Sequence, residues 1–241
     1  MATLFISDLH LCPSRPQTSR LFRDFLSGPA RQAEALYILG DLFEYWAGDD
    51  DLDDPFNAGI SAELRNLSDS GVPLFFMAGN RDFLAGERFA RAAGLTLLPD
   101  PALVEVAGTT ALLMHGDTLC TDDAAYQVFR AEVRSPEWRQ AFLALPLAQR
   151  KAQIEALRRE SEAQKQIKPL DIMDVNLDAV LQTLTSHRCA RLIHGHTHRP
   201  AHHRLEIEGD TRERWVLPDW YVKGGYLSCD TGGCWLLDWP A

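Results

Sequence analysis

The sequence predicts an α/β fold in which two β-sheets pack together. Two observations support this prediction. Five short apolar runs have the length of buried strands, and helix-like segments separate the first three of them. Three further strand-like segments near the end of the chain are separated by turns that contain glycine, which indicates a second sheet. The 241 residues suffice for one domain with a full core and a large insertion.

The predicted elements follow in chain order. The five apolar runs are Thr3–Ser7, Ala35–Leu39, Pro73–Met77, Ala111–Met114 and Arg191–Ile193. The first two helices are expected at Thr18–Leu26 and Asn57–Ser70. In the second of these helices, Leu64 and Leu67 lie on one face. The late strands are expected at Arg214–Leu217, Gly225–Cys229 and Cys234–Asp238.

The stretch from Asp122 to about Lys168 differs from the rest of the chain. We expect two or three helices here, since apolar residues recur at helical spacing: Tyr126, Phe129, Val133, Trp138, Phe142 and Leu145. Pro136 and Pro146 mark helix starts or breaks. The stretch holds nine basic and seven acidic residues, so its net charge is about +2, whereas the rest of the chain carries −12. It is either an inserted cap that faces an anionic ligand or a solvated helical hairpin with ion pairs.

Composition and charge exclude several classes of protein. Apolar residues make up 46% and charged residues 24%, which is ordinary for a globular domain. The net charge of −10 argues against nucleic acid as a partner. No apolar run approaches the roughly 18 residues of a membrane span, and the N-terminus lacks a leader pattern, so we expect a cytoplasmic protein. The five cysteines are few and scattered, which predicts reduced thiols.

Each of the five apolar runs is followed by a polar turn. In order, the turns are Asp8-Leu9-His10, Gly40-Asp41, Gly79-Asn80-Arg81-Asp82, His115-Gly116-Asp117 and His194-Gly195-His196-Thr197-His198. Because sites in open α/β sheets lie at the carboxyl ends of the strands, we expect these distant turns to converge. Each motif alone is weak, since Asp-x-His is common and an asparagine such as Asn80 is ordinarily a turn residue. Their joint occurrence, each after a strand, predicts one site.

The side chains in these turns predict a centre for divalent metal ions. The donors are two aspartates, one asparagine and four histidines: Asp8, His10, Asp41, Asn80, His115, His196 and His198. Oxygen and imidazole donors together suit Mn, Fe, Zn or Co better than Ca or Mg alone. Seven donors are too many for one tetrahedral zinc ion. They fit two ions that share a carboxylate.

The same motifs resemble the signature blocks of the calcineurin-like metallophosphoesterases, from position 8 to position 198. The resemblance implies a four-layer α-β-β-α sandwich, with two sheets inside and helices outside. It implies that one metal ion is held by Asp8, His10, Asp41 and His198. The other would be held by Asp41, Asn80, His115 and His196, with Asp41 as the bridge. These last four residues would be the catalytic ones.

Longer strings carry a narrower resemblance. The strings are Ser7-Asp8-Leu9-His10-Leu11, Gly40-Asp41-Leu42-Phe43-Glu44-Tyr45-Trp46, His115-Gly116-Asp117-Thr118-Leu119-Cys120-Thr121 and Ile172-Met173-Asp174-Val175-Asn176. They resemble the UDP-2,3-diacylglucosamine diphosphatase family of lipid A biosynthesis in Gram-negative bacteria. That family has a helical lid after the fourth block, which implies a lid at about residues 122–168 within a single domain of residues 1–241.

The narrower resemblance also implies an activity and its cofactors. The substrate would be UDP-2,3-diacylglucosamine, a lipid, and water would attack the α-phosphorus of its pyrophosphate. The products would be UMP and 2,3-diacylglucosamine 1-phosphate (lipid X), and the cofactors two Mn²⁺ ions per chain. We expect a monomer that associates peripherally with the cytoplasmic face of the bacterial inner membrane.

The resemblance implies contacts to substrate as well. In the turns these are Asn80, Arg81 and His196, and in the insertion they are Asp123, Ser161, Lys165 and Lys168. Lys165 and Lys168 lie one helical spacing apart, so both can face one ligand; solvated surface lysines are the alternative. We interpret Asp117 and His194 as residues that orient the metal ligands.

Arg81 stands where many relatives in the broader superfamily have a histidine, which is often taken as a general acid. An arginine stays protonated and cannot serve as an acid near neutral pH. It can clamp a phosphate through two hydrogen bonds. Cleavage of a pyrophosphate releases a phosphate monoester, whose pKa is about 6, so this group leaves as an anion without an acid. Arg81 therefore favours cleavage of a phosphoanhydride over hydrolysis of an alkyl diester.

Three alternatives remain at this point. In the first, the chain would be another metallophosphoesterase, such as a nucleotide phosphodiesterase or a phosphoprotein phosphatase. In the second, it would be a scaffold that has lost its metal, and in the third, a single-strand nuclease. Arg81 and the basic insertion argue against the first alternative. The complete donor set argues against the second, and the negative net charge argues against the third.

Overall fold

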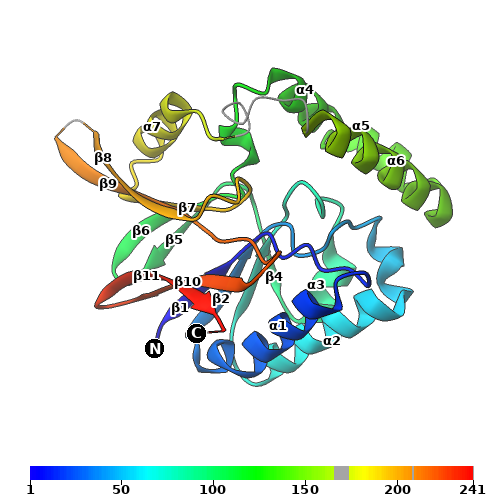
Figure 1. Ribbon diagram of the computed structural model, residues 1–241, viewed down its shortest axis with the longest axis horizontal. Helices are drawn as coiled ribbons and strands as arrows, with labels where there is room; N and C mark the ends of the chain where they lie inside the picture. Colours follow the sequence, from blue (N-terminus) through cyan, green and yellow to red (C-terminus); the bar gives the residue numbers. More distant parts are fainter. Residues whose placement is uncertain (166–173, 208, 241) are drawn as a thin grey trace.

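Two β-sheets face each other, and helices lie on their outer faces (Figure 1). This computed structural model describes residues 1–165, 174–207 and 209–240, and for residues 160–165 it describes the backbone alone. The first sheet has six strands in the order β11-β10-β1-β2-β3-β4. The second has five strands in the order β5-β6-β7-β9-β8.

Four parallel strands form the centre and one edge of the first sheet: β1 (Thr3–Ile6), β2 (Ala35–Leu39), β3 (Leu74–Met77) and β4 (Thr96–Leu98). In register, Thr3 of β1 lies opposite Ala35 of β2. The hairpin of β10 (Gly224–Asp230) and β11 (Gly233–Trp239) adds to β1 in the antiparallel direction. Because β1, β2 and β3 are parallel, the turns that follow them lie at one edge of the sheet.

The second sheet contains β5 (Ala102–Val106), β6 (Thr109–Leu113), β7 (Arg191–His194), β8 (Ala201–Ile207) and β9 (Asp210–Val216). The strands β6, β7 and β9 are parallel, and β5 and β8 run antiparallel at the two edges. The turns after β6 and β7 therefore also share one edge of their sheet.

Apolar side chains from both sheets fill the space between them. Phe5, Leu39 and Met77 of the first sheet share one buried cluster with Leu113 and Ile193 of the second, and all five are fully buried. Burial of each such side chain stabilises the fold by about 1.5–3 kcal/mol. These strands are buried on both faces, so their sequences are continuous apolar runs without alternation.

Helices cover the outer faces: α1 (Pro16–Ser27), α2 (Pro55–Asp69) and α3 (Glu87–Ala93) lie on the first sheet, and α7 (Leu177–Ser186) lies on the second. The local sequence explains α2, because Asp54 caps its first turn and Pro55 is its first residue. Its buried residues Ile60, Leu64 and Leu67 recur at helical spacing. The predicted sandwich of two sheets with helices outside is confirmed.

Three helices occupy the stretch predicted as an insertion: α4 (Ala124–Val133), α5 (Pro136–Leu143) and α6 (Leu147–Lys165). Asp123 caps α4, and Ser135 caps α5, which begins at Pro136 as predicted. Figure 1 shows these helices outside the two-sheet sandwich, beyond the edge at which the strands end. We call α4, α5 and α6 the helical insertion. Short 3₁₀-helices lie elsewhere at Pro29–Gln32 (η1), Asp49–Asp53 (η2) and Asp117–Leu119 (η3).

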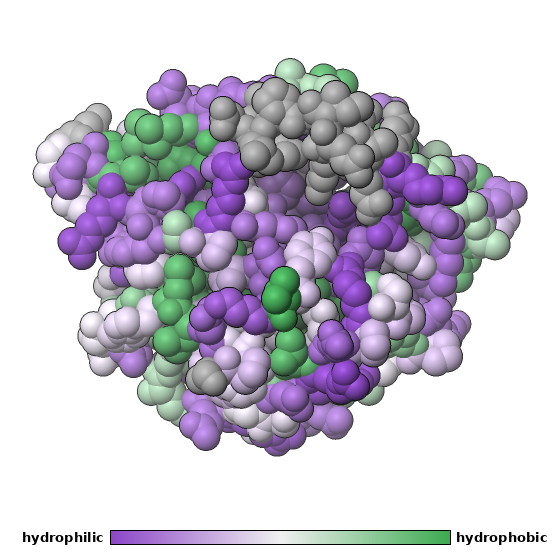
Figure 2. All heavy atoms as spheres, in the orientation of Figure 1, coloured by the Kyte–Doolittle hydropathy of each residue, from purple (hydrophilic) through white to green (hydrophobic). Residues whose placement is uncertain are grey.

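The surface is largely polar. Hydrophilic residues predominate on the face in Figure 2, where apolar residues form small, separate groups. Strongly exposed apolar side chains include Val128, Leu177 and Val222, which belong to three different parts of the chain. Within the described ranges, no helix combines the length and the apolar character that a membrane span needs.

The expectation of five reduced thiols is wrong for two of them. Cys229 of β10 and Cys234 of β11 lie directly opposite each other in the hairpin and form a disulfide. The Cα atoms of this pair are 4.1 Å apart because strand register sets their separation. Cys12, Cys120 and Cys189 are buried and lie outside the disulfide.

Candidate metal centre

The junctions between strands and turns have an unusual backbone conformation. Outside glycine, seven of the described residues have a positive φ, and five of these are predicted metal ligands: Asp8, His10, Asp41, His196 and His198. The left-handed region is disfavoured for L-residues, so the surrounding structure must hold these positions. Such conformations gather at functional sites, and here they follow β1, β2 and β7.

Asp8, His10 and His198 form a first group of donors. His198 Nε2 lies 3.3 Å from Asp8 Oδ1 and 3.4 Å from His10 Nε2. One donor atom from each of the three residues lies within 4.8 Å of the other two. A bound transition-metal ion lies about 2.0–2.2 Å from each nitrogen or oxygen ligand, so atoms this close together can share one ion.

Asp8 presents a single oxygen to this group. Its Oδ2 accepts hydrogen bonds from the Ser7 hydroxyl (2.6 Å) and the His196 N–H (2.8 Å). Its Oδ1 is buried and faces His198 Nε2 at 3.3 Å. A cation between this carboxylate oxygen and the two histidines would satisfy all three atoms in the protein interior.

His115, Asn80 and His196 form a second group. Asn80 Oδ1 lies 2.9 Å from His115 Nε2 and 3.0 Å from His196 Nδ1. His115 Nδ1 lies 2.9 Å from the Leu39 carbonyl oxygen, to which it donates, so Nε2 is the nitrogen that faces Asn80. A positive charge between Nε2 and the Asn80 oxygen, either a proton on His115 or a metal ion, satisfies both atoms.

Asp41 lies between the two groups. Its Oδ2 is 3.7 Å from His10 Nε2, and its Oδ1 is 3.8 Å from His115 Nε2. The Arg81 N–H donates to Oδ1 at 2.8 Å. A Cβ atom at Gly79 would overlap the Asp41 carboxylate, so glycine is required where these two loops meet. One carboxylate therefore directs an oxygen to each group.

A buried carboxylate behind the site holds the same two loops together. Asp82 accepts hydrogen bonds from the Gly79 N–H at 2.8 Å, from the Leu42 N–H at 2.8 Å and from the Asp41 N–H at 3.3 Å. Burial and the neighbouring Asp41 carboxylate raise the pKa of Asp82 to about 7. The position of Asp82 explains why the motif Gly79-Asn80-Arg81-Asp82 ends in an acidic residue.

The electrostatics of the site favour a cation. Burial alone would lower the pKa of His115, but the carboxylates of Asp41, Asp117 and Asp8 outweigh it and raise this pKa to about 9. Burial lowers the pKa of His196 to about 3 and that of His10 well below its usual value. The rings of His196 and His10 are therefore neutral and free to bind a cation, and a divalent ion at His115 would take the place of the proton that the surrounding carboxylates stabilise there.

The remaining predicted residues lie in different places. The backbone N–H of Arg81 donates to Asp41 Oδ1 at 2.8 Å, and its side-chain Nε is buried without a hydrogen-bond partner. Asp123 caps α4. Ser161 and Lys165 belong to α6, but their side chains lie outside the description, and Lys168 lies outside the described residues.

Asp117 has a larger role than the orientation of ligands that we expected. It is fully buried and accepts hydrogen bonds from the Tyr126 hydroxyl (2.8 Å) and from Arg130 Nε (2.7 Å), while Arg134 lies 3.5 Å away. Tyr126, Arg130 and Arg134 recur every four residues along α4 and its C-cap, and this spacing is visible in the sequence. The Tyr126 ring lies 6.1 Å from the His196 ring. Asp117 therefore anchors α4 beside the second group.

His194 is the other residue expected behind the ligands. It is fully buried, and its Nδ1 lies 2.9 Å from the Gly195 carbonyl oxygen. Burial lowers its pKa to about 4, so the ring is neutral. The residues that the sequence reasoning missed near the first group are Glu44 and Tyr221, whose contacts with His10 are described below.

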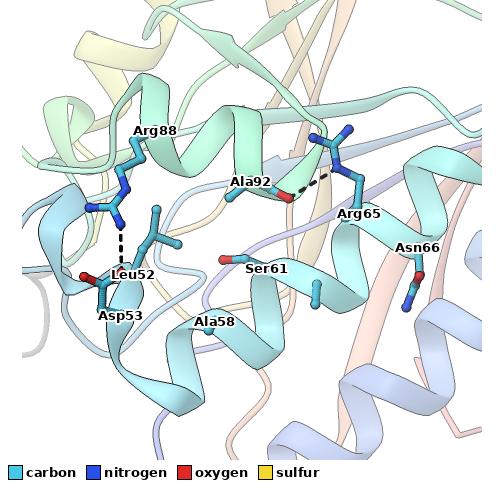
Figure 3. A pocket seen from close by; sticks show the side chains of 9 residues that line it. Leu52, Asp53, Ala58, Ser61, Arg65, Asn66, Arg88 and Ala92 are labelled. Carbon is cyan, nitrogen blue, oxygen red and sulfur yellow. Dashed lines mark hydrogen bonds and ion pairs between the residues drawn. The ribbon is translucent and has the colours of Figure 1, made fainter.

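A separate cavity lies away from this centre. It has a volume of about 390 Å³ and lies between α2 and α3 (Figure 3). Its two arginines are already engaged, since Arg88 pairs with Asp53 at 2.7 Å and Arg65 donates to the Ala92 carbonyl at 3.3 Å. None of the predicted site residues line this cavity.

Fold and site together define a metallophosphoesterase. Residues 1–200 match the calcineurin-like phosphoesterase family, and the chain belongs to that family. Among curated proteins it is 58% identical to the UDP-2,3-diacylglucosamine hydrolase of Aromatoleum aromaticum, over 97% of this chain and 95% of the relative. It is 50% identical to the UDP-2,3-diacylglucosamine hydrolase of Escherichia coli O81, over the full length of both. The narrower resemblance is thus confirmed. A solved archaeal phosphodiesterase aligns over 99% of both chains, with 12% identity and a TM-score of 0.48.

Proposed function

We propose that this chain hydrolyses the pyrophosphate bond of UDP-2,3-diacylglucosamine in lipid A biosynthesis, with UMP and 2,3-diacylglucosamine 1-phosphate as products. Two full-length relatives at 50–58% identity bear the name of that hydrolase. The observation that carries the proposal is the convergence of seven predicted donors from five strand ends on two groups that share Asp41. Membership of the calcineurin-like phosphoesterase family links these donors to one reaction class, the hydrolysis of a phosphate ester or anhydride.

Two Mn²⁺ ions are the cofactors in this proposal. Asp8, His10, Asp41 and His198 would hold one ion, and Asp41, Asn80, His115 and His196 would hold the other. When bound, a pair of divalent ions lowers the pKa of water and neutralises charge that develops on phosphate oxygens. The mixed oxygen and imidazole donors suit manganese, iron, zinc or cobalt better than calcium or magnesium alone, and seven donors are too many for one tetrahedral zinc ion.

The protein's own residues position the substrate. Asn80 and His196 lie 3.0 Å apart at the second group, where they can touch phosphate oxygens. Arg81 would bind the pyrophosphate through two parallel hydrogen bonds. Since the leaving phosphate departs as an anion, no side chain has to donate a proton to it. The absence of a histidine at position 81 therefore matches an anhydride substrate.

The helical insertion is proposed to act as a lid on the substrate. Tyr126 of α4 contacts the site, and Arg130 and Arg134 bring positive charge next to it. Asp123, Ser161, Lys165 and Lys168 are the proposed substrate contacts from this segment. For the whole protein we propose a monomer that associates peripherally with the cytoplasmic face of the inner membrane, where its lipid substrate is found.

The test is incubation of the chain with UDP-2,3-diacylglucosamine and Mn²⁺ in ¹⁸O-labelled water, followed by mass spectrometry of both products. We expect the label in UMP, because attack falls on the phosphorus next to uridine. A sample treated with chelator should show no product until Mn²⁺ is restored. Full activity in chelator, or brisk hydrolysis of another ester with none of this lipid, would overturn the proposal.

A further inference from the structure

Glu44 is a buried carboxylate outside the predicted ligand set. It lies in the loop after β2, three residues beyond Asp41, and it is 6% exposed. Its Oε2 faces His10 Nδ1 at 3.8 Å. The opposite nitrogen of that ring, Nε2, points into the first donor group, where it lies 3.4 Å from His198 Nε2.

The two facing atoms are complementary. His10 Nδ1 is buried without a hydrogen-bond partner. The buried Glu44 Oε2 forms an ion pair with Arg15 and can accept a second hydrogen bond, because a carboxylate oxygen has two lone pairs. A neutral imidazole that binds a cation through Nε2 carries its proton on Nδ1. That proton needs an acceptor, which in metal sites is commonly a carboxylate that fixes the tautomer and the orientation of the ring. Glu44 is placed to be this acceptor after a shift of less than one ångström.

Other contacts hold both partners in place. The Tyr221 ring stacks on the His10 ring, with centroids 5.2 Å apart and an interplanar angle of 12°. The Arg15 guanidinium lies 4.9 Å from the centre of the Tyr221 ring and also pairs with Glu44. Arg15 therefore contacts both Tyr221, which packs on the face of the His10 ring, and Glu44, which faces His10 Nδ1.

Glu44 also contacts the helical insertion. Arg158 of α6 donates to Glu44 Oε1 at 2.5 Å, so the two carboxylate oxygens serve different partners. Arg15 and Arg158 thus both pair with this buried carboxylate. The carboxylate therefore lies between a residue of the proposed lid and a proposed metal ligand.

We propose that Glu44 is a positioning residue that accepts the Nδ1 proton of His10, orients Nε2 toward the first metal ion, and links this ligand to α6 through Arg158. The inference rests on the proposed metal centre. It assigns Glu44 no contact with the reacting atoms. Replacement of Glu44 therefore lowers the affinity for one of the two ions, and turnover falls only as a consequence of that weaker binding.

The experiment measures free Mn²⁺ by electron paramagnetic resonance during titration of the full chain. Glu44→Gln keeps the size of the side chain and weakens the acceptor, and Glu44→Ala removes it. We expect the Kd of one Mn²⁺ to rise about 10–100-fold in Glu44→Ala and less in Glu44→Gln. The matched control is Asp50→Asn. Asp50 pairs with Arg150 of α6, the helix that also contains Arg158, and it is not paired with a predicted metal ligand. This control should keep the wild-type affinity.

A second readout separates positioning from general stability. In the Zn²⁺-loaded protein labelled with ¹⁵N, the His10 Nδ1 proton should give a downfield resonance that moves upfield in Glu44→Gln. Folded Glu44 variants with wild-type Mn²⁺ affinity and an unchanged resonance would overturn the role of Glu44 and leave the proposed function standing. A wild-type chain that binds no Mn²⁺ would overturn both.

Discussion

Replacement of Asp117 by asparagine should weaken the anchor of α4 more than any surface substitution. Asp117 accepts two charge-assisted hydrogen bonds, from the Tyr126 hydroxyl at 2.8 Å and from Arg130 Nε at 2.7 Å. Each is worth about 1.5–3 kcal/mol. Asparagine keeps one carbonyl oxygen and loses the charge, and the side chains of Arg130 and Arg134 are 18% and 21% exposed, so water partly compensates them. We therefore expect a loss of about 3 kcal/mol in the free energy of unfolding.

Urea and thermal unfolding, followed by circular dichroism in excess chelator, measure this loss without a contribution from bound metal. For a chain of this size, about 3 kcal/mol lowers Tm by about 6–12 °C. Glu63→Gln is the control, because the exposed Arg23–Glu63 pair contributes at most about 1 kcal/mol. A change below about 0.5 kcal/mol in Asp117→Asn would refute the anchor.

The pH dependence provides an independent check on the same residue. Burial alone would raise the pKa of Asp117, but His115, His196, Arg134 and Arg130 together lower it well below its usual value. A carboxyl whose pKa is lower in the folded state stabilises the fold above its unfolded pKa of about 3.9, and this stabilisation is lost as the pH falls below it. The stability difference between wild type and Asp117→Asn should be full at neutral pH and shrink in acid. A constant difference would argue against a charge effect.

Three further predictions concern the centre and its surroundings. Asp41→Ala should lose turnover and Mn²⁺ binding, measured by metal analysis, and keep its far-ultraviolet spectrum; retained activity would reject the shared carboxylate. Arg81→Ala should cost about 10–100-fold more in kcat/KM against UDP-2,3-diacylglucosamine than against a small activated phosphodiester, because one charge-assisted contact to pyrophosphate is lost. Equal losses would remove the clamp. Cys12 should be alkylated before Cys120, as measured by peptide mapping with mass spectrometry. Contacts with Ser14 and Arg15 outweigh burial and lower the pKa of Cys12. Burial and the charge of Asp117 raise the pKa of Cys120 to about 12. The reverse order would contradict these shifts.

Local pattern was sufficient for the strands that carry the site. The apolar run Ala35–Leu39 matches β2 residue for residue, and Gly40 and Asp41 follow it directly. Strands such as β8 escaped prediction because Ala201–Ile207 is an edge strand with alternating histidine, arginine and glutamate, which reads as polar. The short strand β4 and the antiparallel β5 were missed as well.

The sequence by itself determined which residue types could bind metal, because each donor stands next to a strand end that apolar periodicity reveals. Only the tertiary structure decided which donors lie close enough to share an ion, that Asp117 anchors α4 and that Glu44 faces His10. It also decided that Cys229 meets Cys234. These contacts depend on strand register, on the order of strands in two sheets and on loops held with a positive φ. Spacing along the chain does not by itself select these contacts, although the four-residue spacing of Tyr126, Arg130 and Arg134 was visible in the sequence.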